Sequence, residues 1–175
     1  RPPCDQDRAS GLAHDLRRDV PEPDGATQQP RVRTHAEQVD AVTLRERGDP
    51  GGTDGFAFCV WDAVEGLVME GAVPPSGTCD AKPCWKDLGG TGFRYLDKAG
   101  TRAAGIRKLV VKAGAQGAAK FILKGRGDGL LMPALPLTLP VRAQLVSTTG
   151  TCWEAEFQSD GLLDNTSTEF HALAH

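Results

Sequence analysis

Short stretches in which apolar and polar residues alternate recur along the chain from residue 39 onward. In residues 151–157 the apolar members Trp153, Ala155 and Phe157 fall on one face, and the residues between them fall on the other. This period of two is typical of a β-strand with one buried face. Similar patterns predict further extended segments at 39–44, 56–61, 67–70, 92–97, 106–112, 119–124, 135–146 and 169–174.

Turn-forming residues separate these segments. The chain contains 21 glycines and 12 prolines, and stretches rich in helix-forming residues are scarce. Residues 113–117 suit a hairpin connection. Pro136 and Pro140 confine the segment 135–146 to a sheet edge or a strand entry, because proline cannot donate to a ladder. We therefore predict an all-β fold, an antiparallel β-sandwich or open barrel of about seven short strands.

The same pattern divides the chain into three parts. Residues 1–38 are rich in proline and charge, which predicts a poorly ordered N-terminal arm or linker. Within this arm, residues 10–18 have the pattern of a helical turn or two, with Leu12 and Leu16 on one face. Residues 39–74 predict a partial β-hairpin segment, either a degenerate repeat or simply another hairpin. Residues 75–175 form the main module.

The chain contains five cysteines in 18.6 kDa. Cys79 and Cys84 have four residues between them and no second pair follows, so the spacing does not match a zinc ribbon. Disulfides formed in an oxidising compartment are the better explanation. We expect Cys59, Cys79, Cys84 and Cys152 to form disulfides that staple the fold, and Cys4 to remain a free thiol.

Two Cys-Trp pairs, at residues 84–85 and 152–153, are the most distinctive feature. Neighbouring side chains in a strand point to opposite faces, so we expect the tryptophans in the core and the cysteines at its margin. A Cys84–Cys152 bridge would close a loop of about 69 residues and stabilise the fold by roughly 4 kcal/mol. Cys59–Cys79 would then be the second bridge. A local Cys79–Cys84 bridge is the alternative, because four cysteines allow three pairings.

Charge and hydropathy exclude several classes of protein. The formal net charge is −3, which gives no electrostatic case for nucleic acid. The longest apolar run, residues 130–141, is interrupted by Pro133, Pro136 and Pro140, so we expect no membrane insertion. The chain begins at Arg1 without an apolar leader, as expected of a mature product or a fragment.

No sequence motif points to catalysis. A nucleophile elbow, a zinc-protease helix and a phosphate loop are all missing, so we predict no catalytic residue, metal ligand or cofactor. Glu154 and Glu156 share one strand face, which is interpreted as solvated rather than as a glycosidase pair. His171 and His175 are four residues apart, but they lie in a strand end rather than on a helix. An enzyme is therefore the less favoured class.

One exposed loop has the composition of a recognition sequence. Arg126, Gly127 and Asp128 lie within a Gly-rich stretch and form a surface turn, with receptor binding as the alternative interpretation. Asn165, followed by Thr and Ser, fits a glycan acceptor if the host glycosylates.

A run of motifs gives the chain a resemblance to a known repeat. These motifs are Lys-Pro-Cys-Trp-Lys at 82–86, Gly-Phe-Arg-Tyr-Leu-Asp at 92–97, Leu-Val-Val-Lys-Ala-Gly at 109–114, Lys-Gly-Arg-Gly at 124–127 and Gly-Thr-Cys-Trp-Glu-Ala-Glu-Phe at 150–157. Together they resemble an uncharacterised Cys-Trp β-rich repeat of predicted bacterial extracellular proteins, over residues 75–172. The resemblance implies secretion and a multi-copy parent protein, and it carries no established activity.

These observations predict a structural or binding module of an extracellular or cell-surface protein, acting in adhesion or assembly on an unknown ligand. The partner would be a protein, a cell surface or another copy of the chain. The alternatives are a secreted hydrolase-type enzyme and a subunit of a surface polymer.

Overall fold

The computed structural model describes residues 31–35, 48–114, 118–127 and 129–173, so most of the predicted arm and the predicted strand at 39–44 lie outside the described residues. Within those ranges the regular structure consists of thirteen β-strands and a single 3-10 turn at Ser159–Gly161. The predicted all-β class is confirmed. The strands are shorter and more numerous than the about seven predicted, because several cover only two to five residues.

Four strands form the front sheet, in the order β11-β10-β2-β3. They are β2 (Phe56–Asp62), β3 (Gly66–Val73), β10 (Val141–Ser147) and β11 (Cys152–Phe157), and every neighbouring pair is antiparallel. The hairpin of β2 and β3 therefore shares one sheet with strands from the C-terminal part of the chain.

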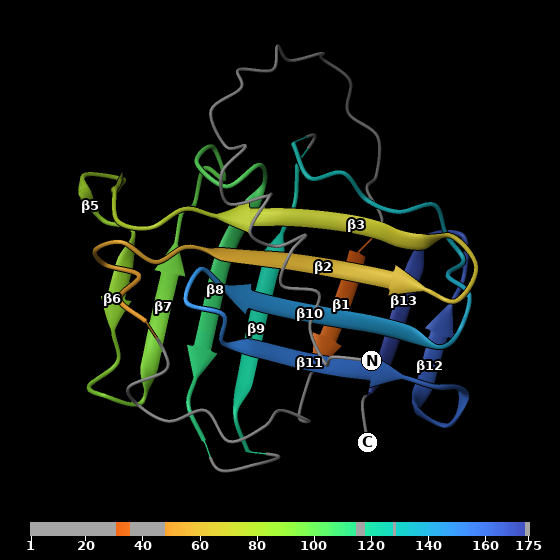
Figure 1. Cartoon of the computed structure of the whole chain (residues 1–175). Coiled ribbons are helices and arrows are strands. Elements are labelled where there is room, and N and C mark those ends of the chain that lie inside the picture. The colour runs from red at the N-terminus through yellow and green to blue at the C-terminus, as the bar shows by residue number, and fades with distance from the viewer. Residues whose placement is uncertain (1–30, 36–47, 115–117, 128, 174–175) are drawn as a thin grey trace.

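The remaining long strands form the back layer. One sheet has the order β6-β7-β8-β9 and is antiparallel, with strands β6 (Trp85–Asp87), β7 (Gly92–Leu96), β8 (Ile106–Lys112) and β9 (Lys120–Gly125). The other has the order β1-β13-β12, with strands β1 (Arg31–His35), β12 (Leu162–Asn165) and β13 (Glu169–Leu173). β1 runs parallel to β13. β1 lies beside β9, so the two sheets continue into one layer (Figure 1).

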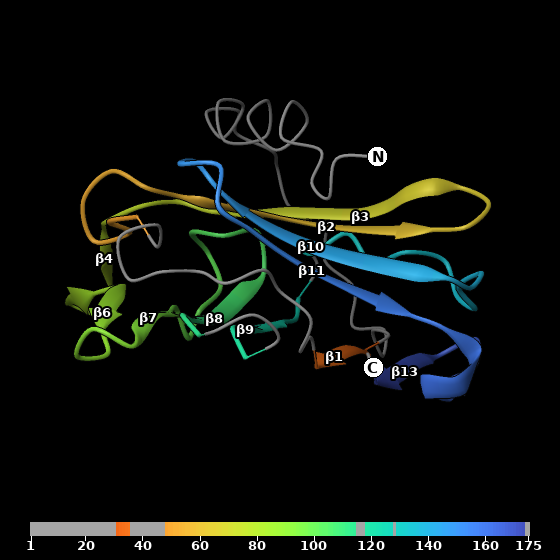
Figure 2. The same cartoon turned by 60° about the horizontal axis from the view of Figure 1, so that its bottom comes forward.

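The two layers pack face to face as a sandwich. The strands of the front sheet run across those of the back layer (Figure 1), and an edge-on view shows the two layers separately (Figure 2). At one edge a small hairpin of β4 (Thr78–Cys79) and β5 (Lys82–Pro83) joins β3 of the front sheet to β6 of the back layer. The predicted sandwich is thus built with crosswise rather than aligned strands.

The core between the layers follows from the alternation in the sequence. Along β2, Phe56, Phe58 and Val60 point inward, as do Trp153, Ala155 and Phe157 along β11. The back layer contributes, among others, Tyr95, Ile106, Leu109, Val111, Phe121 and Phe170. Apolar residues on alternate positions of two facing sheets produce such a core by hydrophobic burial.

Two of the three tryptophans are core residues, as the sequence predicts. Trp153 is 0% exposed and Trp85 is 6% exposed, and Phe56 lies between them with ring centroids 6.0 Å and 5.5 Å away. Trp61 is different, because it lies on the outer face of the front sheet. It is half-buried there, and the guanidinium carbon of Arg142 lies 5.1 Å from its ring centroid.

Candidate functional site: a basic sheet face

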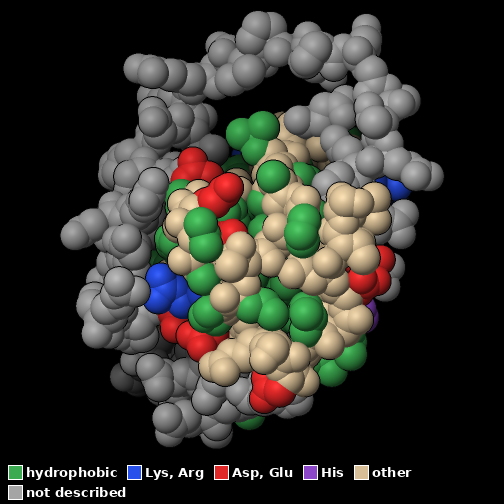
Figure 3. All heavy atoms as spheres, turned by 90° about the vertical axis from the view of Figure 1, so that its right-hand side faces the viewer, with side chains coloured by type: hydrophobic (Ala, Val, Ile, Leu, Met, Phe, Trp, Pro, Cys, Tyr) green, Lys and Arg blue, Asp and Glu red, His purple; other side chains and the backbone are tan. Residues whose placement is uncertain are grey.

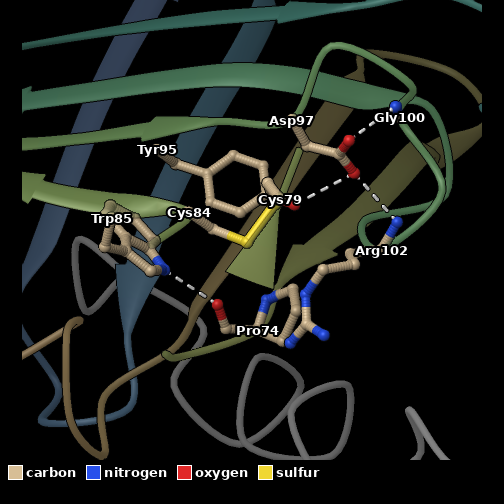
Figure 4. Close-up of a disulfide and its surroundings, with 8 residues drawn as sticks. All are labelled: Pro74, Cys79, Cys84, Trp85, Tyr95, Asp97, Gly100 and Arg102. Carbon is tan, nitrogen blue, oxygen red and sulfur yellow. Dashed lines mark hydrogen bonds between the residues drawn. A yellow bond between two sulfur atoms is a disulfide. The ribbon is translucent and has the colours of Figure 1, made fainter. Parts of the chain in front are cut away.

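The disulfides differ from the favoured sequence prediction. Cys79 is bonded to Cys84, with Cα atoms 4.9 Å apart, so the local alternative is correct (Figure 4). The proposed Cys84–Cys152 and Cys59–Cys79 bridges are wrong. Cys79 and Cys84 lie in the core cluster, whereas Cys59 and Cys152 project from β2 and β11 away from the core, since the neighbouring residues of both strands point inward.

The other cysteines have separate positions. Cys152 is also disulfide-bonded. Cys59 is buried in β2, at 2% exposure. Cys4, predicted as a free thiol, lies outside the described residues.

A tight turn explains why the local bridge forms. Asp80 and Ala81 connect β4 to β5, and both have positive φ, 50° and 61°. Positive φ at both central residues is typical of a type I′ turn, the connection that matches the twist of a two-residue hairpin. The turn brings the strand ends together, and the residues of its tip, Asp80 to Pro83, are all exposed.

A buried carboxylate organises the loop between β7 and β8. Asp97 is 3% exposed, and it accepts hydrogen bonds from the backbone N–H groups of Gly100 and Arg102, both at 3.0 Å (Figure 4). The hydroxyl of Tyr95 donates to the same carboxylate at 3.5 Å. Nearby, the indole N–H of Trp85 donates to the carbonyl of Pro74 at 3.0 Å. These polar groups satisfy one another and therefore serve the scaffold.

Three other residues that the sequence analysis considered as site residues form hydrogen bonds within the fold. Glu154 accepts a hydrogen bond from the Gln144 amide, and Glu156 accepts one from Gln158 at 2.8 Å. The side chain of Asn165 bonds in both directions to the backbone of Leu137, at 2.7 Å and 3.0 Å, which pins the proline-rich loop to β12. These side chains hold strands and loops together.

The predicted surface turn is only partly visible. Arg126 is exposed, and the N–H of Leu130 donates to the carbonyl of Gly127 at 3.1 Å, which closes a turn. Asp128 lies outside the described residues. His171 is half-buried in β13, and His175 lies outside the described residues, so their pairing is not described.

The outer face of the β6-β7-β8-β9 sheet carries an unusual arrangement of charge. Its core-facing positions are taken by residues such as Tyr95, Leu109 and Phe121, so the intervening residues project outward. Six of these outward residues are basic, and we call them the basic face: Lys86, Arg94, Lys108, Lys112, Lys120 and Lys124. In these four strands, which are fully described, no aspartate or glutamate takes an outward position.

The register places the basic residues directly opposite one another. Lys86 faces Arg94 between β6 and β7, and two further pairs between β8 and β9 are Lys108 with Lys124 and Lys112 with Lys120. Partners on adjacent strands lie about 5 Å apart, and the two lysine pairs are separated by about 13 Å along the strands. Like charges directly opposite each other destabilise a sheet. The fold therefore keeps an arrangement that opposes its own stability.

Apolar residues occupy the centre of the basic face. Val110 and Ile122 face each other across β8 and β9, between the two lysine pairs, and Arg94 faces Val110 from β7. Val110 is only 7% exposed although it points outward. Lysine and arginine can cover apolar surface with their methylene stems while the charged heads remain in water. The face therefore presents a ring of cations around a small apolar centre.

The charge is distributed unevenly over the molecule. At the end of the sandwich formed by the β2–β3 turn and β12, red acidic side chains surround green apolar ones, with few basic side chains among them (Figure 3). Val64 and Leu163, in the turn and in β12, are exposed at 75% and 58%. The net charge of −3 thus averages over separate acidic and basic regions.

Sequence reasoning missed the basic face because it used the net charge of the whole chain. A local signal was present. Positions 108, 110 and 112 and positions 120, 122 and 124 have the same Lys-apolar-Lys spacing in two adjacent predicted strands. Alternation alone places each trio on one strand face, but the register that sets lysine opposite lysine depends on the hairpin connection.

No family model, curated protein or solved structure matches the chain. The resemblance to an extracellular Cys-Trp repeat therefore stays a prediction. Among the described residues, no helix is long and apolar enough to cross a membrane. In the same residues, no group of three or more His, Cys, Asp or Glu side chains is arranged to hold a metal ion.

Proposed function

We propose that this chain is a binding module of an extracellular or cell-surface protein, and that its basic face binds an anionic polysaccharide. The observation that carries the proposal is the set of three like-charge pairs on β6–β9, with no outward carboxylate on these strands. A bound polyanion would reverse the repulsion within each pair and release counterions on binding.

The class of binding partner is inferred from the uncharged residues that lie beside the basic residues on the basic face. The outward positions of β6–β9 contain Leu96, Val110 and Ile122 but no aromatic residue. Binding of single-stranded nucleic acid uses aromatic side chains on which the bases stack, and these are lacking on the basic face. A linear polymer with repeated carboxylate or sulfate groups fits the doubled rows of lysines better.

The proposed location has separate support. Cys79 and Cys84 form a disulfide, and disulfides persist mainly in oxidising compartments. Anionic polymers are abundant on cell surfaces, so adhesion or assembly at such a surface is consistent with both features. The resemblance to bacterial extracellular repeats points the same way.

The test compares two double variants of equal charge. Lys108→Gln with Lys124→Gln removes one opposed pair of the basic face, whereas Lys82→Gln with Lys98→Gln removes two exposed lysines outside it. Binding to immobilised dextran sulfate at low salt is measured for both. We expect the first variant to bind roughly tenfold more weakly and the second to change little.

Two outcomes would contradict the proposal. Equal losses in both variants would show that binding depends on overall charge rather than on the basic face. Tighter binding to a DNA duplex than to dextran sulfate at matched salt would show that the polysaccharide class is wrong.

A further inference from the structure

One end of the sandwich combines exposed apolar side chains with acidic ones. Val64 in the β2–β3 turn and Leu163 in β12 are among the most exposed large apolar residues of the described chain, at 75% and 58%. Each has an acidic neighbour, Glu65 and Asp164, and Figure 3 shows acidic side chains around the apolar ones. We call this surface the acidic end and define it by Asp62, Val64, Glu65, Leu163 and Asp164.

Hydrogen bonds through the proline-rich loop join the two halves of the acidic end. The carboxylate of Asp62 accepts from the backbone N–H of Thr138 at 3.3 Å, and the N–H of Ala63 donates to the carbonyl of Thr138 at 3.0 Å. The preceding loop residue, Leu137, exchanges two hydrogen bonds with the side chain of Asn165 in β12, at 2.7 Å and 3.0 Å. The β2–β3 turn and β12 therefore belong to one connected surface.

The acidic end lacks compensating cations. The three segments that build it, residues 62–67, 129–140 and 159–165, contain four acidic residues and no lysine or arginine. Arg142 follows the second segment, but its guanidinium carbon lies 5.1 Å from the ring centroid of Trp61, on the outer face of the front sheet. Exposed apolar residues with a charged rim are one mark of a surface that binds a partner.

The basic face of the same chain has the complementary composition. It presents six basic residues around Val110 and Ile122, and its strands have no outward carboxylate. Its cations match the carboxylates of the acidic end, and its apolar centre matches Val64 and Leu163. Opposite potentials of this kind steer association and fix the orientation of the partners. We propose that the basic face of one molecule is a docking surface for the acidic end of a second copy of this chain.

One molecule cannot make this contact with itself. Within the back layer, β1 and β13 lie between β9 of the basic face and β12 of the acidic end. Three strand spacings separate β9 from β12 by about 14 Å, whereas an ion pair requires a distance of about 4 Å. The β2–β3 turn and β12 also lie at the right of Figure 1, beyond the four strands of the basic face. Pairing of the two surfaces therefore takes two molecules.

The contact joins two different surfaces, so it is heterologous. Each copy in a pair keeps one unused acidic end or basic face, and such contacts continue from copy to copy into a ring or an open filament. The inference does not depend on polysaccharide binding, but both contacts use the same lysines. A polyanion therefore competes with the second copy and shortens the assembly.

Sedimentation velocity of the full chain tests whether the contact forms. At low salt, we expect the weight-average sedimentation coefficient to rise with protein concentration. It is expected to return to the monomer value in about 1 M salt, where charges are screened beyond about 3 Å. A monomer at every concentration in low salt would overturn the inference.

Two double variants of equal charge test the acidic end. Glu65→Gln with Asp164→Asn removes two carboxylates from it, whereas Glu70→Gln with Asp80→Asn removes two exposed carboxylates elsewhere. We expect the first variant to remain a monomer over the concentrations at which the wild type associates, and the second to associate like the wild type. Equal association of the two variants would mean that the acidic end is not the docking segment.

A mixing experiment tests the head-to-tail arrangement. Lys108→Gln with Lys124→Gln weakens the basic face and retains the acidic end, and Glu65→Gln with Asp164→Asn does the reverse. Each variant alone is expected to be a monomer. An equal mixture is expected to form dimers and nothing larger, because each variant has one working surface. A mixture that stays monomeric would overturn the inference.

Dextran sulfate separates this inference from the proposed function. The acidic-end variant is expected to bind dextran sulfate like the wild type, and the polymer is expected to return wild-type assemblies to monomers. Assemblies that persist with bound dextran sulfate, or a wild type that binds it but is always a monomer, would overturn self-association alone. A wild type that associates through these two surfaces but does not bind dextran sulfate would overturn the proposed function alone.

Discussion

Tyr95 shows most clearly how a single buried side chain responds to its surroundings. It is fully buried, and its hydroxyl lies 3.5 Å from a carboxylate oxygen of Asp97. Burial raises the pKa of Tyr95, and the Asp97 charge raises it further against a smaller opposing effect of Arg102, to about 12. Burial disfavours the charged phenolate because the core cannot solvate it.

This pKa leads to a prediction for alkaline pH. Tyr95 is the only tyrosine of the chain, so absorbance near 295 nm reports its ionisation alone. We expect a titration midpoint near 12 in the folded protein and near 10 in guanidinium chloride, the ordinary tyrosine value. Because the unfolded chain loses its proton first, the contribution of Tyr95 to stability is fully present below about pH 10 and is lost as the pH rises through 12, by about 3 kcal/mol in total.

The matched control for this titration is Tyr95→Phe. Its unfolding free energy should start lower, because Asp97 loses a hydrogen-bond donor, but it should not show the extra fall between pH 10 and 12. A wild-type midpoint at 10 would mean that Tyr95 is solvated.

At the residue scale, the sequence predicted which tryptophan side chains are buried, but it did not predict the disulfide and hydrogen-bond partners. Alternation in residues 151–157 placed Trp153 in the core, where it is 0% exposed. It could not show which cysteine approaches Cys84, since that depends on the turn at Asp80 and Ala81. The hydrogen bonds that hold Asp97 were also hidden, because they depend on how the loop folds back.

At the scale of single elements, the β4–β5 hairpin contains a strained position. Ala81 has a φ of 61°, a left-handed conformation that costs an alanine about 1 kcal/mol and costs glycine very little. Asp-Gly is a preferred central pair for a type I′ turn.

We therefore expect Ala81→Gly to stabilise the protein by about 0.5–1 kcal/mol, measured by urea unfolding. Ala104 has a φ of 45° in the β7–β8 loop and provides a comparison site of the same residue type. A destabilised Ala81→Gly variant would mean that the turn does not have this geometry.

The β8–β9 hairpin contains the two opposed lysine pairs. Replacing one lysine of a pair is expected to raise the stability of the fold and to weaken binding of a polyanion. Lys124→Glu replaces repulsion with attraction opposite Lys108 and should stabilise the fold by about 0.5 kcal/mol in low salt. The same change should weaken binding to dextran sulfate. Lys98→Glu, in the β7–β8 loop, is the control for net charge. Loss of both stability and binding in Lys124→Glu would mean that Lys124 serves the fold.

The elements themselves were partly predictable from sequence. The strands at 56–61, 92–97, 106–112 and 151–157 were predicted close to their observed positions because alternation is a local property. β12 was missed, and the predicted strand at 135–146 begins only at Val141, after the proline-rich loop. The parallel pairing of β1 with β13 joins distant parts of the chain and left no local pattern to find.

At the scale of the whole molecule, the crosswise sandwich separates charged and buried surfaces that the sequence mixes. One layer presents the basic face, and the other presents an outer face that is buried at its centre. Composition could not reveal this separation, because 20 basic and 23 acidic residues nearly cancel over the chain. Only the sheet register decides which charges share a surface.

The most direct test of the basic face is to map where an anionic polymer contacts the folded protein. Backbone amide signals of the isotope-labelled protein are followed by NMR while short dextran sulfate chains are added at low salt. We expect the shifted signals to cluster on β6, β7, β8 and β9 and to return towards their free positions as salt is raised. Shifts that cluster on the β4–β5 hairpin or on the front sheet instead, or that spread evenly over the surface, would contradict the proposal.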